Sequence, residues 1–162
     1  MPLGSAETVA LAGMMGSGKS TVARRLGLLL GRRVVSVDEV IARAAGKPIP
    51  AIFAEDGEAA FRALERQAIA ALPAGVVADL GGGAFCDPAG AARLLATARV
   101  VFLDVSAAEA ARRIGAGEGR PLAARWEALL ARRRPLYARA HLRVEVDGLS
   151  PDAVARRILE AL

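Results

Sequence analysis

Short apolar runs and longer amphipathic stretches alternate along the chain. The runs carry valine, alanine and leucine at consecutive positions, as in strands buried on both faces of a parallel sheet. Between them, apolar side chains recur every three or four residues, which indicates helices packed on one side. The predicted strands are 8–12, 34–37, 75–80, 99–105 and 142–146, and clear helices are 21–30 and 58–72.

This alternation predicts an α/β fold, in which a parallel sheet is covered by helices on both faces. Pro73 is expected to end the helix over 58–72. The chain of 162 residues contains no repeat or linker, so we predict one domain over 1–162. Further helix-start signals are Asp87 before Pro88, the capping box of Ser106 and Glu109, and Ser150 before Pro151.

Residues 13–21 fit the phosphate-loop pattern G-x-x-x-x-G-K-[ST]. Glycines allow the backbone to turn tightly so that successive N–H groups converge on a phosphate, and the following helix adds its positive dipole end. Lys19 would reach the β- and γ-phosphates, and the Ser20 hydroxyl would ligate Mg²⁺. An ordinary glycine-rich turn is the alternative, but the strand before and the helix after favour nucleotide binding. The predicted ATP-binding residues here are Gly13, Gly16, Ser17, Gly18, Lys19, Ser20 and Thr21.

Composition narrows the choice of partners. The formal charge is +5, but it comes mostly from arginines spread along several helices, and aromatic residues make up only 4%. We therefore expect no nucleic-acid partner. No apolar run reaches membrane-spanning length and no secretory signal is evident, so we expect no membrane partner. Cys86 is the only cysteine, which suits a reducing cytoplasm. We expect a cytoplasmic monomer.

Polar groups at the carboxyl ends of the strands are candidate ligand contacts, because ligands bind at that edge of such sheets. Asp38 follows the second strand, and Gly81 to Gly83 follow the third. The segment 115–121 has three glycines and Arg120, which favours a flap closing over a phosphate. A plain flexible loop is the alternative for this segment.

Six motifs in one order resemble shikimate kinases across nearly the whole chain. The resemblance implies a three-layer α/β/α kinase fold like that of nucleoside monophosphate kinases, with strand order 2-3-1-4-5 and a lid at about 115–126. It also implies phosphorylation of the shikimate 3-hydroxyl by Mg-ATP, a step of aromatic amino-acid biosynthesis. The motifs are the phosphate loop, Asp38, the run 49–58 leading to Phe61 and Arg62, residues 81–84, residues 120–122 and residues 133–137.

The resemblance assigns Arg62 and Arg133 to the substrate carboxylate, a task that suits the forked guanidinium group. Two other roles stay open: Arg62 is spaced to pair with Glu58, and Arg133 lies in an arginine cluster that could end a helix before Pro135. By resemblance, Asp38 accepts hydrogen bonds from the substrate hydroxyls and helps to draw off the proton. Its alternative is a helix N-cap. Backbone N–H groups of Gly81, Gly82 and Gly83 would approach the substrate, or the three would form a simple turn.

Phosphoryl transfer requires positioning and charge neutralisation. We assign Lys19, Mg²⁺ and Arg120 to the charge on the transferring group, with Arg120 as an arginine finger. By resemblance, Arg113 packs near the adenine, although it could equally be a solvated arginine beside Arg112.

One position departs from the family. Shikimate kinases usually carry two aspartates spaced D-x-D after the second strand, the first holding Mg²⁺ through water, and here that first position is Ser36. A hydroxyl supplies no negative charge to the metal. Our hypothesis is that Asp79, at the end of the third strand, partly replaces the missing aspartate. The alternative is a carboxylate that pairs with a nearby arginine. Two other functions also stay open: a related sugar-acid kinase, such as a gluconate kinase, and a nucleotide-binding protein without catalysis.

Overall fold

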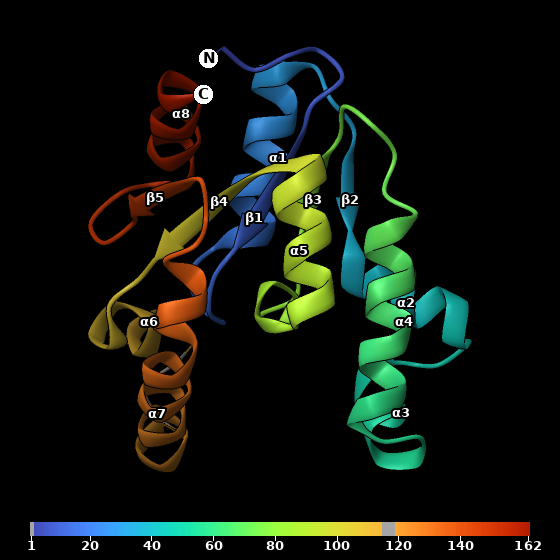
Figure 1. Ribbon diagram of the computed structural model, residues 1–162. Helices are drawn as coiled ribbons and strands as arrows, with labels where there is room; N and C mark the ends of the chain where they lie inside the picture. Colours follow the sequence, from blue (N-terminus) through green and yellow to red (C-terminus); the bar gives the residue numbers. More distant parts are fainter. Residues whose placement is uncertain (1, 115–118) are drawn as a thin grey trace.

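The computed structural model describes residues 2–114 and 119–162, and for residues 119–123 the backbone alone. Five parallel strands form one sheet in the order β2-β3-β1-β4-β5 (Figure 1), so the predicted fold class and strand order are confirmed. β1 is central and wholly buried, as its unbroken apolar run predicts. The strands are β1 (Thr8–Ala12), β2 (Val34–Ser36), β3 (Val77–Asp79), β4 (Ala98–Asp104) and β5 (Leu142–Glu145).

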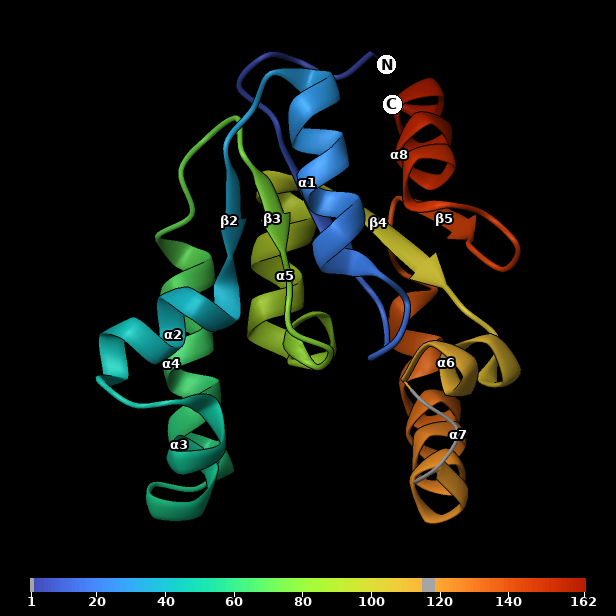
Figure 2. The ribbon, with the colours of Figure 1, turned by 180° about the vertical axis from the view of Figure 1, so that it is seen from behind.

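Helices cover both faces of the sheet. α1 and α8 lie side by side on one face, and α5 lies on the other (Figures 1 and 2). Beyond the carboxyl ends of the strands, α2 to α4 lie on the β2 side and α6 and α7 on the β4 side. The helices are α1 (Lys19–Leu30), α2 (Val37–Ala45), α3 (Ile49–Glu55), α4 (Glu58–Ala70), the 3₁₀ turn η1 (Ala84–Cys86), α5 (Pro88–Thr97), α6 (Ala107–Ile114), α7 (Gly119–Tyr137) and α8 (Pro151–Ala161).

Most predicted helix starts are confirmed by side-chain caps. Asp87 accepts a hydrogen bond from Gly90 N at 3.0 Å, and Ser150 accepts one from Ala153 N at 3.1 Å. These side chains satisfy backbone donors that have no partner inside the helix. One predicted helix end is slightly different: α4 ends at Ala70, two residues before the predicted end at residue 72.

The junction between β2 and α2 differs from the prediction. The strand ends at Ser36, and Val37 is already helical. The Ser36 hydroxyl caps α2 by accepting a hydrogen bond from Glu39 N at 3.4 Å. The alternative role of Asp38 as the cap is therefore wrong: Asp38 lies within the first turn, which leaves its carboxylate available to the cleft.

The end of α7 also differs from the prediction. The helix continues through Pro135 to Tyr137, so a helix ending before Pro135 is wrong. A proline in the last turn removes only one hydrogen bond, and the buried Tyr137 holds this turn in place. Its ring stacks on Phe102 of β4, with 4.7 Å between ring centroids.

Candidate active site

The phosphate loop connects the central strand β1 to the N-terminus of α1. Gly16 and Gly18 have φ angles of +87° and +85°, a backbone region that residues with a Cβ rarely adopt. With these two turns, the loop bends back over the first turn of α1, where the positive end of the helix dipole lies. The loop therefore has the form that its sequence pattern predicts for anion binding.

Lys19 is the cation of this loop, and its side chain is half-buried. Its Nζ donates hydrogen bonds to the carbonyl oxygens of Gly13 at 2.6 Å and Met14 at 3.1 Å. Burial lowers the pKa of Lys19 to about 8, although the nearby carboxylates of Asp79 and Asp38 act in the opposite direction. An anionic phosphate at this point would compensate the buried charge.

Ser20 and Asp79 meet beneath the loop. The Ser20 hydroxyl donates to Asp79 Oδ2 at 2.6 Å. Ser36 is the register partner of Asp79 on the neighbouring strand, and all three residues line the same cleft. Among the residues whose side chains the structure describes, no arginine forms an ion pair with Asp79, so the alternative role predicted for this carboxylate is not observed there.

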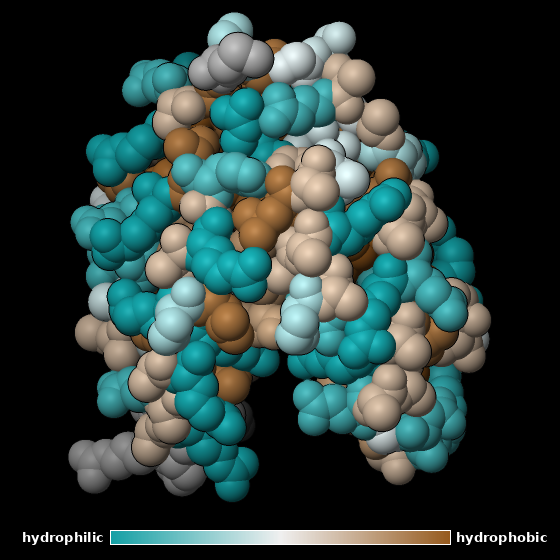
Figure 3. Space-filling model, viewed as in Figure 1, coloured by the Kyte–Doolittle hydropathy of each residue, from teal (hydrophilic) through white to brown (hydrophobic). Residues whose placement is uncertain are grey.

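A cleft of about 860 Å³ opens at the carboxyl ends of the strands. It runs from the phosphate loop to the side chains of α3 and α4, with α7 forming the opposite wall. Figure 3 shows the surface hollowed between these two sides of the molecule. The cleft has the size of a site that holds small ligands and opens at the edge expected for an α/β fold.

The glycine run after β3, Gly81 to Gly83, lies against three charged side chains. A Cβ atom added at any of the three positions would lie closer to a side-chain atom than an ordinary van der Waals contact allows. Because the run has no side chains of its own, these three groups can lie directly against its backbone. The distance from the added Cβ would be 2.6 Å at Gly81 to Asp38 Oδ1, 3.1 Å at Gly82 to Arg133 Nη1 and 2.5 Å at Gly83 to Arg62 Nη2.

Asp38 is half-buried and lines the cleft, and one oxygen of its carboxylate, Oδ1, is buried. Its Oδ1 accepts no hydrogen bond from any side chain or backbone group that the structure describes. Burial raises the pKa of Asp38, and the charge of Asp79 raises it further. A buried acceptor without a donor is unfavourable, so this oxygen is suited to a ligand hydroxyl.

Arg62 is held by a residue that the sequence analysis missed. Its Nη1 donates to Glu65 Oε1 at 2.7 Å; the predicted ion pair with Glu58 is also present, with 3.7 Å between Arg62 Nε and the mostly exposed Glu58 carboxylate. Only 1% of Glu65 is exposed, and burial raises its pKa although Arg62 opposes the shift. The signal available in the sequence was the three-residue spacing of Arg62 and Glu65 on one helix face.

Arg133 and Tyr137 bring α7 onto the glycine run. Arg133 lines the cleft, and its Nη1 contacts Met14 Sδ at 3.7 Å. The Tyr137 hydroxyl donates to the Gly82 carbonyl oxygen. Arg133 lies within the helix rather than at its end, so the alternative role of ending the helix is wrong for this residue.

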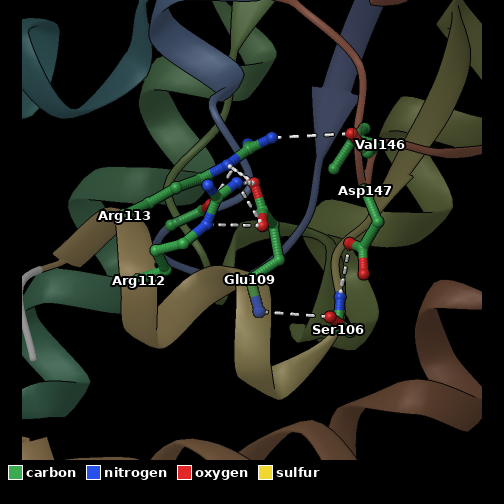
Figure 4. A network of polar contacts seen from close by, with 7 residues as sticks. Ser106, Glu109, Arg112, Arg113, Val146 and Asp147 are labelled. Carbon is green, nitrogen blue, oxygen red and sulfur yellow. Dashed lines mark hydrogen bonds and ion pairs between the residues drawn. The ribbon is translucent and has the colours of Figure 1, made fainter.

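Arg113 on α6 belongs to a network of polar contacts with Glu109 and the Val146 carbonyl oxygen (Figure 4). Glu109 accepts hydrogen bonds from both Arg112 and Arg113, and Arg113 Nη1 lies 3.5 Å from the Gly16 carbonyl oxygen. The predicted capping box is half confirmed, because Glu109 N donates to Ser106 Oγ at 3.2 Å. The amide of Ser106 donates instead to Asp147 at 2.9 Å, which leaves the Glu109 carboxylate free to orient the two arginines.

The predicted lid lies only partly within the described residues. Residues 115–118 are outside them, and 119–126 form the first turns of α7. The backbone of Arg120 lies in this helix, and its side chain is not among those that the structure describes. Its predicted contact with a phosphoryl group stays a prediction.

Comparisons with known proteins agree with this geometry. A family model described as shikimate kinase matches residues 15–162. The shikimate kinase of Limosilactobacillus fermentum is 45% identical over 163 residues, which cover 94% of this chain and 93% of that protein. The chain belongs to the shikimate kinase family. The predicted enzyme class, a kinase that phosphorylates shikimate with ATP, is therefore confirmed.

Solved structures separate this family from others with the same fold. A shikimate kinase from Acinetobacter baumannii in complex with shikimate superposes with a TM-score of 0.88 at 32% identity, covering 96% of this chain and 92% of that one. A gluconokinase from Sinorhizobium meliloti has a TM-score of 0.64 at 17% identity and shares the fold alone. Within the described residues, every helix is too short or too polar to cross a bilayer.

Proposed function

We propose that the chain transfers the γ-phosphoryl group of ATP to the 3-hydroxyl of shikimate in the cleft between the phosphate loop and α4. The glycine run carries this proposal, because it gathers one carboxylate and two guanidinium groups around a single space. A ring that carries hydroxyls and a carboxylate needs this combination of acceptor and cations. That space adjoins Lys19 and Ser20 in the same cleft.

On the nucleotide side, the loop residues Gly13 to Thr21 would bind the phosphates through backbone amides. Lys19 would leave the carbonyl oxygens of Gly13 and Met14 and contact the β- and γ-phosphates. Arg113, fixed by Glu109, would lie against the adenine. Arg120 would neutralise charge on the transferring phosphoryl group.

On the acceptor side, Arg62 and Arg133 would grip the shikimate carboxylate, and the amides of Gly81 to Gly83 would lie along the ring. Asp38 would accept the proton of the 3-hydroxyl. As that proton moves to Asp38, the hydroxyl oxygen bonds to the γ-phosphorus, the bond to the β-phosphate oxygen breaks, and ADP leaves. Alignment of the two oxygens supplies most of the catalysis in such reactions.

The residues at the loop also fit a magnesium ion. Mg²⁺ usually retains several waters and binds through few protein oxygens together with the nucleotide phosphates. Ser20 would be a direct ligand and Asp79 would hold a coordinated water, taking the role lost at Ser36. When bound, the ion would draw charge from the β- and γ-phosphates. The 2.6 Å contact between Ser20 and Asp79 supports this assignment.

Metal binding tests this assignment independently of turnover. Binding of Mn²⁺ to the ADP complex, measured by electron paramagnetic resonance, is expected to weaken about tenfold or more in Asp79→Asn. Because Ser36 and Asp79 are register partners, combining Ser36→Asp with Asp79→Ser should restore most of the affinity. Unchanged Mn²⁺ affinity in Asp79→Asn would contradict the role of this carboxylate.

The function itself is tested by a coupled ADP-release assay with shikimate, gluconate and nucleoside monophosphates. We expect turnover with shikimate alone and a product whose ³¹P spectrum identifies the 3-phosphate. Turnover with gluconate would favour a sugar-acid kinase. ATP binding without turnover on any acceptor would favour a nucleotide-binding protein without catalysis.

We also propose that the protein is a cytoplasmic monomer with one domain and a lid over 115–126. The half-buried thiol of Cys86, the only cysteine, fits a reducing compartment. Sedimentation with and without both substrates would test the monomer.

A further inference from the structure

The carbonyl oxygens of the phosphate loop are held by side chains from three different elements. Lys19 on α1 binds those of Gly13 and Met14, and Arg113 on α6 approaches that of Gly16. The remaining one, Met15, accepts a 2.8 Å hydrogen bond from the indole N–H of Trp126 on α7. Each loop carbonyl from 13 to 16 is thus drawn toward a donor on the protein.

Trp126 is well placed to hold the Met15 carbonyl in one orientation. Its side chain is 6% exposed and belongs to the hydrophobic core, so the indole has little freedom to move. Met15 itself is 59% exposed, so its side chain is not held by packing. The hydrogen bond from Trp126 joins α7 to the Met15 backbone carbonyl. The contact therefore controls the orientation of one peptide group.

That peptide group carries the amide of Gly16. In a planar trans peptide the C=O and N–H bonds point in opposite directions. Because the Met15 oxygen is held toward α7, the Gly16 N–H points away from α7. Within the described residues, this amide donates no hydrogen bond, so it remains available to an anion.

We propose that Trp126 is a positioning residue for phosphate binding: its indole N–H fixes the Met15 carbonyl and thereby directs the Gly16 amide toward the nucleotide phosphate. The inference rests on the proposed binding of ATP phosphates by residues 13–20. It extends that proposal to α7, the helix that also carries Arg133 on the same face two turns later. One rigid element then supports both the phosphate-binding amide and the arginine of the acceptor side.

The experiment compares the affinities of ADP and AMP by calorimetry. AMP lacks the β-phosphate that a phosphate loop cradles, so the ratio of the two dissociation constants isolates phosphate binding from adenine binding. Trp126→Phe keeps an aromatic ring and removes the N–H. The preference for ADP over AMP is expected to fall about threefold to tenfold, the range for losing one hydrogen bond.

A second variant preserves the shape of the side chain. Trp126 is the only tryptophan of the chain, so growth of a tryptophan auxotroph on benzothienylalanine replaces this one indole by an isostere whose sulfur cannot donate. The same loss of ADP preference is expected. Leu130→Ala is the control, because Leu130 is buried on α7 and is not among the residues that line the cleft; this variant should lower the melting temperature and leave the ADP-to-AMP ratio unchanged.

Three results would overturn the proposal: an unchanged ratio in both Trp126 variants, equal weakening of ADP and AMP, or the same fall in Leu130→Ala. The measurement uses nucleotides alone. If the unmodified protein fails to phosphorylate shikimate, the proposed function falls, and the ratio still tests Trp126.

Discussion

The two halves of the cleft are built in different ways. The nucleotide half is centred on a continuous segment, residues 13–21, whose backbone amides are proposed to bind the phosphates. The acceptor half gathers single side chains from α2, α4 and α7 against a glycine run after β3. A backbone site tolerates changes in its neighbours as long as the turns survive, whereas a site of converging side chains depends on the relative placement of several helices.

The largest effect is expected from removing Lys19, the one cation within residues 13–21. Lys19→Ala should lower kcat by about 10³-fold, because the charge of the transferring phosphoryl group loses the cation of the loop. The coupled ADP-release assay measures this. Lys47→Ala is the matched control, since Lys47 is the only other lysine and pairs with Glu55 and Asp56 at the surface. If kcat falls less than tenfold in Lys19→Ala, the proposed role of the phosphate loop in catalysis is contradicted.

On the acceptor side, Arg62→Lys keeps the charge and removes the fork. We expect the KM for shikimate to rise about 30-fold with little change in the KM for ATP, because a lysine cannot hold both Glu65 and a carboxylate in one plane. Arg66→Lys, one turn later on the same helix and paired with Asp87, should leave both constants unchanged. An equal rise in both KM values would mean that the two halves are not separate.

The glycine run gives a graded test. An added methyl at Gly83 would lie 2.5 Å from Arg62, and one at Gly82 would lie 3.1 Å from Arg133. Gly83→Ala should therefore raise the KM for shikimate about tenfold and Gly82→Ala about threefold, by displacing each guanidinium group. Steady-state kinetics on both variants decide the order. The reverse order would contradict the contacts described for these two arginines.

The smallest effect is expected away from the cleft. Ser150→Ala removes the cap of α8 and should lower the free energy of unfolding by about 1 kcal/mol. Urea denaturation measures the change. Both KM values should stay as they are, because α8 packs on α1 far from the acceptor side; a kinetic change would show that the scaffold is coupled to the site.

Features that depend on neighbouring residues were predictable from the sequence. The phosphate loop and the caps at Asp87 and Ser150 follow from local patterns, whereas the strand order 2-3-1-4-5 came from the resemblance to shikimate kinases. What failed depends on tertiary contact. Nothing local distinguishes Ser36 from Asp38 as the cap of α2, and stacking of Tyr137 on Phe102 allows α7 to pass Pro135. Glu65 and Trp126 were missed because each acts through a partner that only the fold reveals.

The glycine run also limits how the specificity of the enzyme can evolve. Every single substitution there adds atoms toward Asp38, Arg133 or Arg62, so mutation in this wall can shrink the acceptor pocket and never enlarge it. A lineage drifting toward a bulkier acceptor must change another part of the cleft, such as α3, where Ile49 and Phe53 line it with replaceable side chains. We therefore expect substitutions in α3 to change the range of accepted substrates, while the glycine run after β3 stays constant.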